Sequence, residues 1–391
     1  MYNGSIDDCD YGLETDGSMK ALILSCNTGT GHNACAAAVR EAMLARGVPC
    51  DVRDGLGFVS GLVSRAVSAG HVCFYRYLPG LYGRAYRLAE RRVKTDGGDS
   101  ATFRFMGLGA KRLRACIERG GYTHVICTHL FPAMMLTGMQ RRDPLPIRTA
   151  FIATDYTASP GYECVGLDWC FVPEPGLIPR FVRPDMPAER VVGCGIPVRR
   201  DFQGAGDRVA ARQALGLDPD RRHLLVMSGS MGCGPLAQAL EQLKARLSDS
   251  VEISVICGTN RRLYRQLDRR FGGVENIHLH GMVEHISPFM DSADLYLTKP
   301  GGLSVSEALS KGLPMVLLMA VEGCETYNMR YCVELGAAKA ARTAPEAAGV
   351  CAALLRDDAA LETMRRSMAG LFQPPAAEVV CDRLLQTGAA K

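Results

Sequence analysis

A glycine turn with a histidine directly after it stands near the start of the chain, as GTGH at residues 29–32. The apolar residues 22–24 before it are typical of a buried strand, and the Ala-rich sequence from residue 36 favours a helix. Such a strand, turn and helix can cradle a phosphate, because glycines let the anion approach the N–H groups at the helix start. The pKa of an imidazole lies near neutral pH, so His32 adds a group that can move a proton.

Two other interpretations of this stretch stay open. His32 can be an ordinary surface or helix-capping residue. If Ala34 counts as the third small residue, the stretch also fits the dinucleotide fingerprint G-x-G-x-x-G/A, and Asp51 lies near the spacing of its ribose-binding acid. The dinucleotide hypothesis needs one cofactor site, with the catalytic groups in the other half of the chain. Residues 228–235 (SGSMGCGP) give that other half its own glycine turn, which argues against it.

The stretch 294–317 (DLYLTKPGGLSVSEALSKGLPMVL) carries the most specific pattern in the sequence. A strand is predicted to end at residue 299, a Pro-Gly-Gly turn follows, and a helix is predicted to begin near Ser304. Ser304 and Glu307 have capping-box spacing, in which an N-cap serine and a glutamate three residues later exchange hydrogen bonds. Alternatively, the backbone N–H groups of 302–304 bind a diphosphate, and Glu307 accepts hydrogen bonds from both hydroxyls of a ribose.

Short β-rich runs alternate with helical patterns along the whole chain. They are 21–26, 48–53, 123–128, 148–153 and 168–172 in the first half, and 222–228, 251–257, 275–280, 293–298 and 313–319 in the second. This alternation predicts an α/β fold with parallel sheets and crossover helices. Composition shifts to Gly, Pro and charged residues around 193–206, where we place the linker between two doubly wound domains that face each other across a cleft.

The chain of 391 residues is long enough for two such domains. We predict a disordered leader at 1–18, because this segment is acidic and rich in turn-forming residues. The first domain is predicted to span 19–198 and the second 199–391, with C-terminal helices that can return to the first domain.

Composition excludes several classes of protein. A hydrophobic content of 47% and a charged content of 22% are typical of a folded, water-soluble protein, and a net charge of +4 is too small by itself to indicate nucleic acid. The 16 cysteines include no C-x-x-C pair and no apolar segment precedes residue 20, so we expect a cytoplasmic protein with reduced thiols. The longest apolar runs, such as 313–321, are too short to span a bilayer, so any membrane contact is expected to be peripheral. No spacing of His and Cys predicts a metal site.

Residues 56–94 combine an amphipathic pattern with aromatic and basic side chains. Apolar residues recur at helical spacing within 59–67, with serines at 60, 64 and 68 on the opposite face. After residue 71, Phe, Tyr and Leu interleave with Arg and Lys, a composition that suits the headgroup level of an anionic membrane. The same pattern also suits a helix packed on its own domain with a solvated basic face, or a nucleic-acid surface.

Three stretches together resemble a known family. KPGGLSVSEAL (299–309), followed by GLP and a Glu-rich turn that ends at Asn328, is similar to the donor half of nucleotide-sugar glycosyltransferases with the GT-B fold. With NTGTGHNACAA (27–37) and YLPGLYGRAYRLAE (77–90), the chain resembles the monogalactosyldiacylglycerol synthase and processive diacylglycerol glucosyltransferase family. The peptidoglycan transferase that adds N-acetylglucosamine to lipid I is a more distant relative. The resemblance covers residues 19–370 and implies two Rossmann-like domains that face a cleft.

The resemblance implies where the donor binds. The glycine loop 229–232 matches the loop that contacts the diphosphate, and Gly258 and Asn260 match a segment that lines the nucleotide pocket. The backbone of Val283 matches the group that pairs with the uracil edge. The donor-binding residues that we predict are Gly229, Ser230, Gly232, Gly258, Asn260, Val283, Gly301, Gly302, Ser304, Glu307, Gly323, Cys324, Glu325 and Asn328.

The sugar-binding turn departs from the family pattern. Glu307 matches the family's ribose-binding glutamate, but the turn Pro-Gly-Gln-Glu-x-x-Asn has Cys324 at its Gln position in this chain. A thiol cannot replace the donors and the acceptor of an amide. The sequence therefore does not predict which sugar is transferred.

The resemblance also implies an acceptor side in the first domain. His32 matches a histidine that acts as general base or orients the acceptor hydroxyl. Asp155 matches a Thr-Asp pair near the acceptor and can assist His32, bind a hydroxyl or hold a turn; Ser159 and Tyr162 replace a His and a Trp found in many relatives. His129 is either an acceptor-side residue or a core histidine. We predict His32 and Asp155 as catalytic residues, and Gly31, Tyr82, Arg84 and His129 as acceptor-side or membrane-side residues.

Together these observations predict an inverting glycosyltransferase at the cytoplasmic face of a membrane. It would move a hexose from a UDP-sugar to a lipid alcohol, diacylglycerol first among them, without a required metal or other cofactor. Expected partners are the UDP-sugar, the lipid acceptor and an anionic membrane surface, and not nucleic acid. The alternatives are transfer to a polyprenyl-linked or soluble acceptor, and a non-catalytic UDP-sugar sensor.

Overall fold

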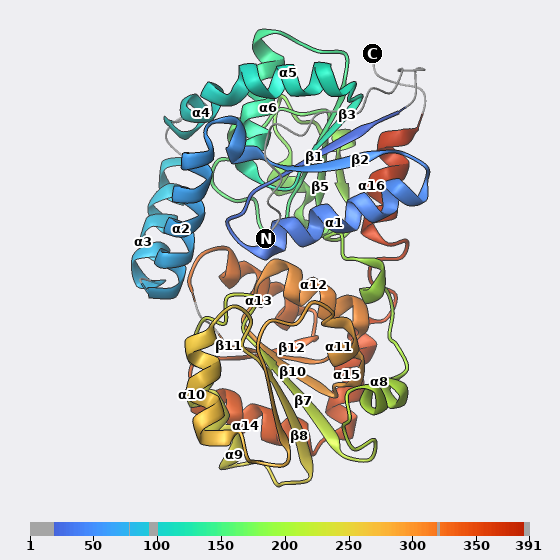
Figure 1. Cartoon of the computed structure of the whole chain (residues 1–391). Helices are drawn as coiled ribbons and strands as arrows, with labels where there is room; N and C mark the ends of the chain where they lie inside the picture. The colour runs from blue at the N-terminus through green and yellow to red at the C-terminus, as the bar shows by residue number, and fades with distance from the viewer. Residues whose placement is uncertain (1–18, 78, 94–100, 319–320, 387–391) are drawn as a thin grey trace. The chain divides into compact units, whose positions relative to one another are not determined.

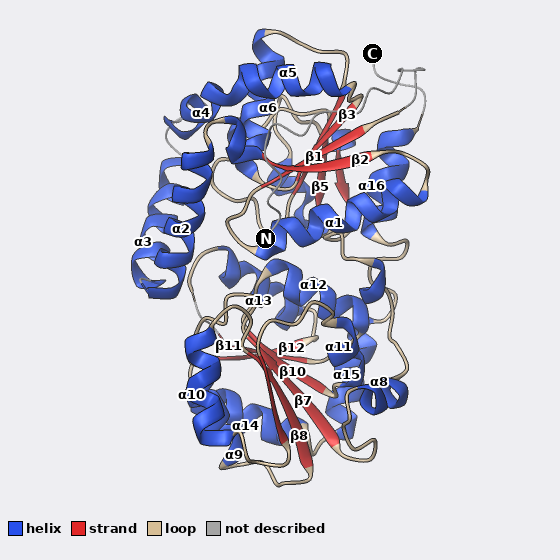
Figure 2. Ribbon diagram, in the orientation of Figure 1, coloured by secondary structure: helices blue, strands red, loops and turns tan. Residues whose placement is uncertain are grey.

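The chain divides into two compact units in the computed structural model, which describes residues 19–77, 79–93, 101–318 and 321–386 (Figure 1). The first unit comprises the residues up to 71, residues 86–199 and those from 374 on, and the second comprises 72–85 and 200–373. Within the described residues, each unit contains one six-stranded sheet with helices packed on it (Figure 2). The α/β class predicted from the alternation of elements is confirmed.

All neighbouring strands in both sheets are parallel. The first sheet has the order β2-β1-β3-β4-β5-β6, with β1 (Ala21–Ser25), β2 (Cys50–Asp54), β3 (His124–Cys127), β4 (Arg148–Ile152), β5 (Trp169–Val172) and β6 (Val191–Gly193). The second has the order β12-β11-β10-β7-β8-β9, with β7 (Arg222–Met227), β8 (Val251–Ile256), β9 (Ile277–His280), β10 (Leu295–Thr298), β11 (Met315–Leu318) and β12 (Ala338–Ala341). Only β6 and β12, both short edge strands, were not predicted.

The helices connect these strands. Those up to the middle of the chain are α1 (Thr30–Ala45), α2 (Gly61–Tyr77), α3 (Pro79–Val93), α4 (Ala101–Met106), α5 (Ala110–Gly120), α6 (Leu130–Arg142) and α7 (Ile178–Phe181). The later ones are α8 (Arg208–Ala214), α9 (Leu236–Lys244), α10 (Arg261–Phe271), α11 (Ser287–Ser292), α12 (Gly302–Lys311), α13 (Cys324–Glu334), α14 (Ala344–Leu354), α15 (Asp358–Met368) and α16 (Ala376–Leu385). Short 3-10 turns are η1 (Gly55–Phe58), η2 (Gly107–Gly109), η3 (Tyr162–Cys164), η4 (Pro175–Leu177), η5 (Ala188–Arg190) and η6 (Arg200–Phe202).

The central strands carry the cores because helices cover them. Every residue of β1 and β3 is buried, as expected for parallel strands with helices on both faces. The last helix, α16, belongs to the first unit and packs beside α1, where Arg46 forms ion pairs with Glu378 and Asp382 (Figure 1). The C-terminal segment therefore completes the first core.

Each sheet has one point where the strand order reverses. In the first unit the chain moves outward from β1 to β2 and then returns to place β3 on the other side of β1. In the second unit it moves outward from β7 through β8 to β9 and then returns to place β10 beside β7. In doubly wound sheets ligands bind at the carboxyl ends of the two strands that flank such a point. The loops after β1 and β3, and those after β7 and β10, are therefore where the fold predicts binding sites.

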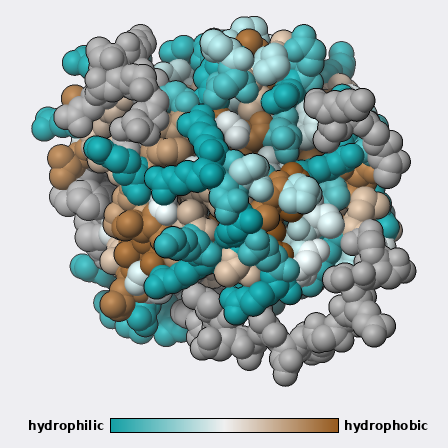
Figure 3. Space-filling model, turned by 90° about the horizontal axis from the view of Figure 1, so that it is seen from above, coloured by the Kyte–Doolittle hydropathy of each residue, from teal (hydrophilic) through white to brown (hydrophobic). Residues whose placement is uncertain are grey.

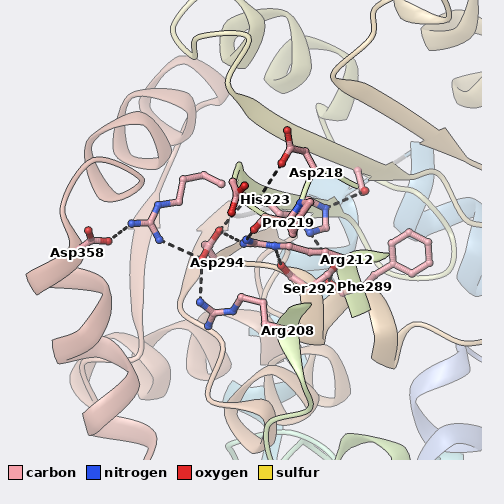
Figure 4. A network of polar contacts seen from close by, with 12 residues as sticks. Arg208, Arg212, Asp218, Pro219, His223, Phe289, Ser292, Asp294 and Asp358 are labelled. Atoms are coloured by element: carbon pink, nitrogen blue, oxygen red, sulfur yellow. Dashed lines mark hydrogen bonds and ion pairs between the residues drawn. The ribbon is translucent and has the colours of Figure 1, made fainter. Parts of the chain in front are cut away.

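A buried polar network ties β7 to β10 at their amino ends (Figure 4). Asp294, just before β10, accepts a hydrogen bond from the backbone N–H of His223 at 2.9 Å and pairs with Arg212 at 2.6 Å. The imidazole of His223 is fully buried between the hydroxyls of Ser254 and Ser292, each 2.9 Å away. Burial, the main cause, lowers the pKa of His223 to about 4, so this ring is neutral at pH 7. The network fixes the two strands whose opposite ends carry the second switch point.

Helix α2 turns its polar side toward its own unit. Ser64 is buried and donates a hydrogen bond to the carboxylate of Asp54, whereas the side chain of Leu62 is 71% exposed. Leu62, one of the apolar residues at helical spacing within 59–67, therefore does not pack on the unit. The physical reason is the acceptor that Asp54 provides at the end of β2, because this partly buried carboxylate binds the Ser64 hydroxyl as a hydrogen-bond donor.

Candidate functional site

The first switch point brings together His32 and the ends of two other strands. His32 lies in the first turn of α1, and its Nδ1 is 2.8 Å from the carbonyl oxygen of Thr128, which follows β3. The same nitrogen is 3.1 Å from Oγ1 of Thr154, after β4. Because a carbonyl can only accept, Nδ1 must carry the proton, and in the neutral ring Nε2 is then the basic nitrogen. The backbone of the fold thus selects the tautomer of His32.

His32 and Thr128 each donate a side-chain hydrogen bond to the backbone carbonyl of the other. Oγ1 of Thr128 donates to the backbone carbonyl of His32 at 3.1 Å. Two hydrogen bonds therefore hold the start of α1 against the end of β3 and fix the position of the ring. The sequence pattern pointed to His32 but gave no indication of these threonine partners, which come from loops 96 and 122 residues away.

A second histidine lies beside the first. His129 is the N-cap residue of α6, and its Nδ1 accepts the backbone N–H of Phe131 at 3.1 Å. In its neutral form the proton is therefore on Nε2, the opposite tautomer to that of His32. The two ring centroids are 4.5 Å apart with an interplanar angle of 72°. His129 is partly exposed, so the interpretation as a core histidine is wrong.

The other residues predicted for the first domain lie on several different elements. Gly31 precedes His32 in the first turn of α1. Asp155 is partly exposed and directly follows Thr154, and its carbonyl accepts the N–H of Thr157 at 2.7 Å. Tyr82 and the exposed Arg84 lie in α3, within the segment 72–85 that groups with the second unit, and the side chain of Tyr82 is outside the described part.

The glycine turn after β7 has a backbone that only glycine adopts readily. Gly229 and Gly232 have φ values of +62° and +55°, and Gly258, in the loop after β8, has +57°. A Cβ on Gly232 would lie 2.2 Å from the carbonyl oxygen of Cys257, and a Cβ on Gly258 would lie 2.2 Å from that of Ser230. The two loops therefore pack backbone against backbone, and side chains at these glycines would force them apart.

Asn260 fastens the two loops to α10. Its Oδ1 caps the helix by accepting the N–H of Leu263 at 3.0 Å, and its Nδ2 donates to the carbonyl of Gly232 at 2.9 Å. Val283, in the loop after β9, is partly exposed, and a backbone bond of 3.1 Å from Gly258 to Gly281 joins that loop to the others. A cavity of about 430 Å³ between α9 and α10 is lined by Asn260 but by no other predicted donor-site residue.

Helix α12 begins earlier than the capping-box interpretation requires. Its N-cap is Gly301 and its first residue Gly302, so Ser304 is inside the helix and Glu307 belongs to the second turn. No side chain caps this helix, and the interpretation of Ser304 as N-cap is therefore wrong. The physical reason is that the preceding turn is held from outside, by a 3.0 Å hydrogen bond from Asn328 to the carbonyl of Pro300. The N–H groups of the first turn of α12 have no acceptor within the helix.

The residues of the turn before α13 separate into buried and accessible ones. Glu325 and Asn328 are buried, and they lie one turn apart on α13. Glu325 forms an ion pair with Lys299, directly ahead of the Pro-Gly-Gly turn. Gly323 has φ +133°, and Cys324 after it is partly exposed. Cys324, at the position where the family has Gln, is therefore more accessible than its two polar neighbours.

Lys299 is a site residue that the sequence pattern did not reveal. Its burial lowers the pKa of the amine, but the carboxylate of Glu325 outweighs this effect, and the pKa is raised. Lys299 is therefore protonated at any working pH. Its position between a strand end and a Pro-Gly-Gly turn was the only available indication. In the part of the chain that the structure describes, no three His, Cys, Asp or Glu side chains gather as a metal site would require.

Two family models match the chain, one in each half. The model of monogalactosyldiacylglycerol (MGDG) synthase matches residues 32–198, and that of the glycosyltransferase family 28 C-terminal domain matches residues 223–366. Each half of the chain is therefore similar to a glycosyltransferase family, and the chain is a glycosyltransferase. The resemblance noted from the sequence motifs and the prediction of an enzyme are both confirmed.

Relatives of named activity agree with this assignment. The glycosyltransferase is 26% identical to the processive diacylglycerol beta-glucosyltransferase of Bacillus cytotoxicus over 376 residues, which cover 95% of each chain. It is 29% identical to the enzyme of the same name from Staphylococcus carnosus over 241 residues, a match that spans 62% of each chain.

Solved structures show the fold of this glycosyltransferase. MurG of Acinetobacter baumannii matches with a TM-score of 0.59 at 14% identity, covering 94% of this chain and 99% of MurG. The spinosyn rhamnosyltransferase SpnG matches with a TM-score of 0.63 at 14% identity, covering 94% of this chain and all of SpnG. The predicted GT-B fold is therefore confirmed.

Proposed function

We propose that this glycosyltransferase moves a hexose from a UDP-sugar to the hydroxyl of diacylglycerol, with inversion at the anomeric carbon, at a membrane surface. The observation that carries the proposal is the fixed tautomer of His32 at the switch point of the first sheet. Transfer to an alcohol needs a base for one proton, and the Nε2 lone pair of His32 supplies it. The acceptor is taken from the names of the relatives, which are diacylglycerol glucosyltransferases.

The proposed reaction is a single displacement. The acceptor oxygen forms a bond to the anomeric carbon while the bond from that carbon to the β-phosphate oxygen breaks, and the electron pair of the broken bond stays on UDP. The acceptor proton passes to Nε2 of His32, whose Nδ1–H remains bonded to Thr128. Attack from the face opposite the leaving group inverts the configuration. Asp155, adjacent to Thr154 in this loop, is proposed to support the histidine or to hold the acceptor.

The proposed donor site uses backbone groups for most of the charge on UDP. The N–H groups at the start of α12 and the glycine turn at 229–232 stabilise the diphosphate, so the proposal includes no metal or other cofactor. Glu307, in the second turn of α12, accepts hydrogen bonds from the ribose hydroxyls, and the backbone at Val283 pairs with uracil. The turn at Gly323 and Cys324 contacts the sugar, whose identity the proposal leaves to experiment.

A cluster of exposed apolar side chains supports the membrane part of the proposal. Leu62 is 71%, Leu108 68% and Phe105 42% exposed. Arg112, at the start of α5, donates to the carbonyl of Val59 at 2.7 Å, which joins the segment that carries the leucine at 108 to the start of α2. Exposed basic residues accompany the apolar ones, namely Arg65, Arg104, Lys111 and Arg112. Figure 3, which views the first unit from the side of α5, shows hydrophobic patches among hydrophilic side chains.

Apolar and basic side chains together suit an anionic bilayer surface, since the apolar ones enter the headgroup layer and the cations attract the lipid charge. No helix in the described residues is long and apolar enough to cross a membrane. On the basis of the apolar and basic surface, we propose attachment to one face of the bilayer, with the cytoplasmic face as the location.

Product formation tests this proposal directly. The enzyme is given mixed micelles of diacylglycerol and anionic phospholipid, with UDP-glucose, UDP-galactose or UDP-N-acetylglucosamine supplied separately, and the extracted lipids are analysed by mass spectrometry. A glycosyl-diacylglycerol from one donor supports the proposal and identifies the sugar. UDP binding without any glycolipid would contradict diacylglycerol as the acceptor. It would favour a polyprenyl-linked or soluble acceptor, or a non-catalytic UDP-sugar sensor.

Flotation with liposomes tests the proposed membrane-binding surface of the first unit. The variant Leu62→Ser/Leu108→Ser should lose binding to vesicles that contain anionic phospholipid. Val182→Ser, which changes another exposed apolar residue of the first unit, is the matched control and should bind as the wild type does. Equal flotation of all three proteins would contradict the proposed surface.

A further inference from the structure

Lys299 occupies the second switch point, where three segments of the second unit meet. A Cβ on Gly229, in the turn after β7, would lie 3.0 Å from Cε of Lys299. A Cβ on Gly301, the N-cap of α12, would lie 3.2 Å from Nζ. The third segment is the start of α13, where Glu325 forms an ion pair with the lysine. Glycine at 229 and 301 therefore lets both turns lie directly against this side chain.

The surroundings of Lys299 strengthen the electrostatic interactions of its charged amine. Its side chain is 12% exposed and that of Glu325 is 3% exposed, so little water screens the amine. Electrostatic interactions are stronger in such a site than in bulk water. Glu325 keeps the amine protonated, and the two glycine turns beside the lysine are those whose backbone N–H groups the proposed function assigns to the diphosphate.

We propose that Lys299 is a donor-binding residue whose ammonium group stabilises the diphosphate of the donor from beneath the two glycine turns. Glu325 is the positioning residue that holds this ammonium in place and keeps it charged. The inference rests on the proposed function, because that function supplies the diphosphate. It assigns Glu325 a role toward Lys299, whereas Cys324 in the same turn stays partly exposed.

A second buried lysine provides a matched control. Lys311 is on the same helix α12, at its last residue, and pairs with Asp291 at 2.9 Å. Its side chain is 5% exposed, so Lys311→Met removes a buried ion pair of the same kind. Lys311 lies at the end of α12 opposite to the Pro-Gly-Gly turn. A loss that arises only from breaking a buried ion pair should appear in both variants.

The experiment compares the Kd of UDP and of uridine for four proteins by calorimetry. These are the wild type, Lys299→Met, the double variant Lys299→Met/Glu325→Gln and Lys311→Met. The double variant guards against misfolding, because it leaves no unpaired buried charge. We expect both Lys299 variants to bind UDP at least tenfold more weakly and uridine within twofold of the wild type. Lys311→Met should bind both ligands as the wild type does.

Three other outcomes would overturn the inference. If the double variant binds UDP within twofold of the wild type, Lys299 does not act on the diphosphate. If UDP and uridine lose the same affinity, the lysine only supports the fold of the pocket. If the wild type itself binds no UDP, the proposed donor site is wrong, and the role of Lys299 falls with it.

Discussion

The two switch points of this glycosyltransferase are both reversals of strand order in a parallel sheet, but their chemistry differs. At the first, between β1 and β3, two partly exposed imidazoles have their tautomers fixed by hydrogen bonds to the backbone. At the second, between β7 and β10, glycine turns surround a buried ion pair. The first therefore presents a side chain that can gain a proton, and the second presents backbone N–H groups and a permanent charge.

This difference follows from what each proposed step requires. Proton transfer needs a group with a pKa near the working pH, reachable by the substrate, and a lone pair in a fixed direction. Binding a diphosphate needs donors that stay in place without titrating, and backbone N–H groups meet that need when neighbouring contacts hold the turn. A mutation at the first switch point should thus affect turnover, and one at the second should affect donor affinity.

The sharpest test of this division is His32→Ala. We expect kcat to fall by about 10²- to 10⁴-fold, the range for loss of a general base, while the Kd of UDP stays within twofold. Steady-state kinetics with the best donor and calorimetry with UDP measure the two quantities. Added imidazole should restore part of kcat, because it replaces the missing base.

Two results would break the comparison at this residue. A variant that keeps more than a tenth of the wild-type kcat would show that His32 is not the base. A large loss of UDP affinity would show that the first switch point also contributes to donor binding.

A second test concerns His223, beneath the second switch point. Its pKa is lowered to about 4 in the folded state, against about 6.5 in the unfolded chain. Above pH 6.5 both states hold the neutral ring. As the pH falls, the unfolded state gains a proton that the folded state excludes, so stability is lost between about pH 6.5 and 4, by about 3 kcal/mol in total.

The variant His223→Gln should lack this part of the pH dependence. Urea unfolding of both proteins at pH 7 and pH 4.5 gives the comparison, and the wild type should lose more stability between the two values. His285→Gln, a change at an exposed position of the same unit, serves as control and should follow the wild type. Parallel curves for His223→Gln and the wild type would contradict the buried neutral ring. UDP affinity at pH 7 should change little, since the network lies at the amino ends of the strands (Figure 4).

The sequence predicted the strands and the fold that carry both sites better than it predicted the contacts between their residues. Ten strands and the α/β class followed from hydrophobic runs and glycine turns, which are local features, and the GT-B fold followed from the resemblance of three motifs to a known family. The edge strand β12 (AKAA) was missed because it lacks the β-branched residues that mark a strand. The start of α12 was misplaced because Asn328, from another helix, holds the turn before it. Lys299 and Thr154 were missed for the same reason, since their roles depend on partners distant in the chain.

The smallest effects are expected for variants of Asn260. These variants distinguish a residue that supports the glycine turn from one that contacts the nucleotide directly. Asn260→Ala removes both the cap of α10 and the bond to the carbonyl of Gly232, whereas Asn260→Asp keeps an oxygen for the cap. We expect the alanine variant to lose about 1 kcal/mol of unfolding free energy and the aspartate variant clearly less. Urea unfolding measures these differences.

Both Asn260 variants should bind UDP several-fold more weakly, and uridine nearly as well as the wild type does. The reason is that the amide acts on the turn that faces the diphosphate and leaves the nucleoside contacts unchanged. If uridine affinity falls as much as UDP affinity, Asn260 contacts the nucleoside itself, as the family resemblance implied. In that case substrate binding at the second switch point would depend on a side chain, as the first depends on His32. The two switch points would then differ only in the chemical type of that side chain, an amide at one and an imidazole at the other.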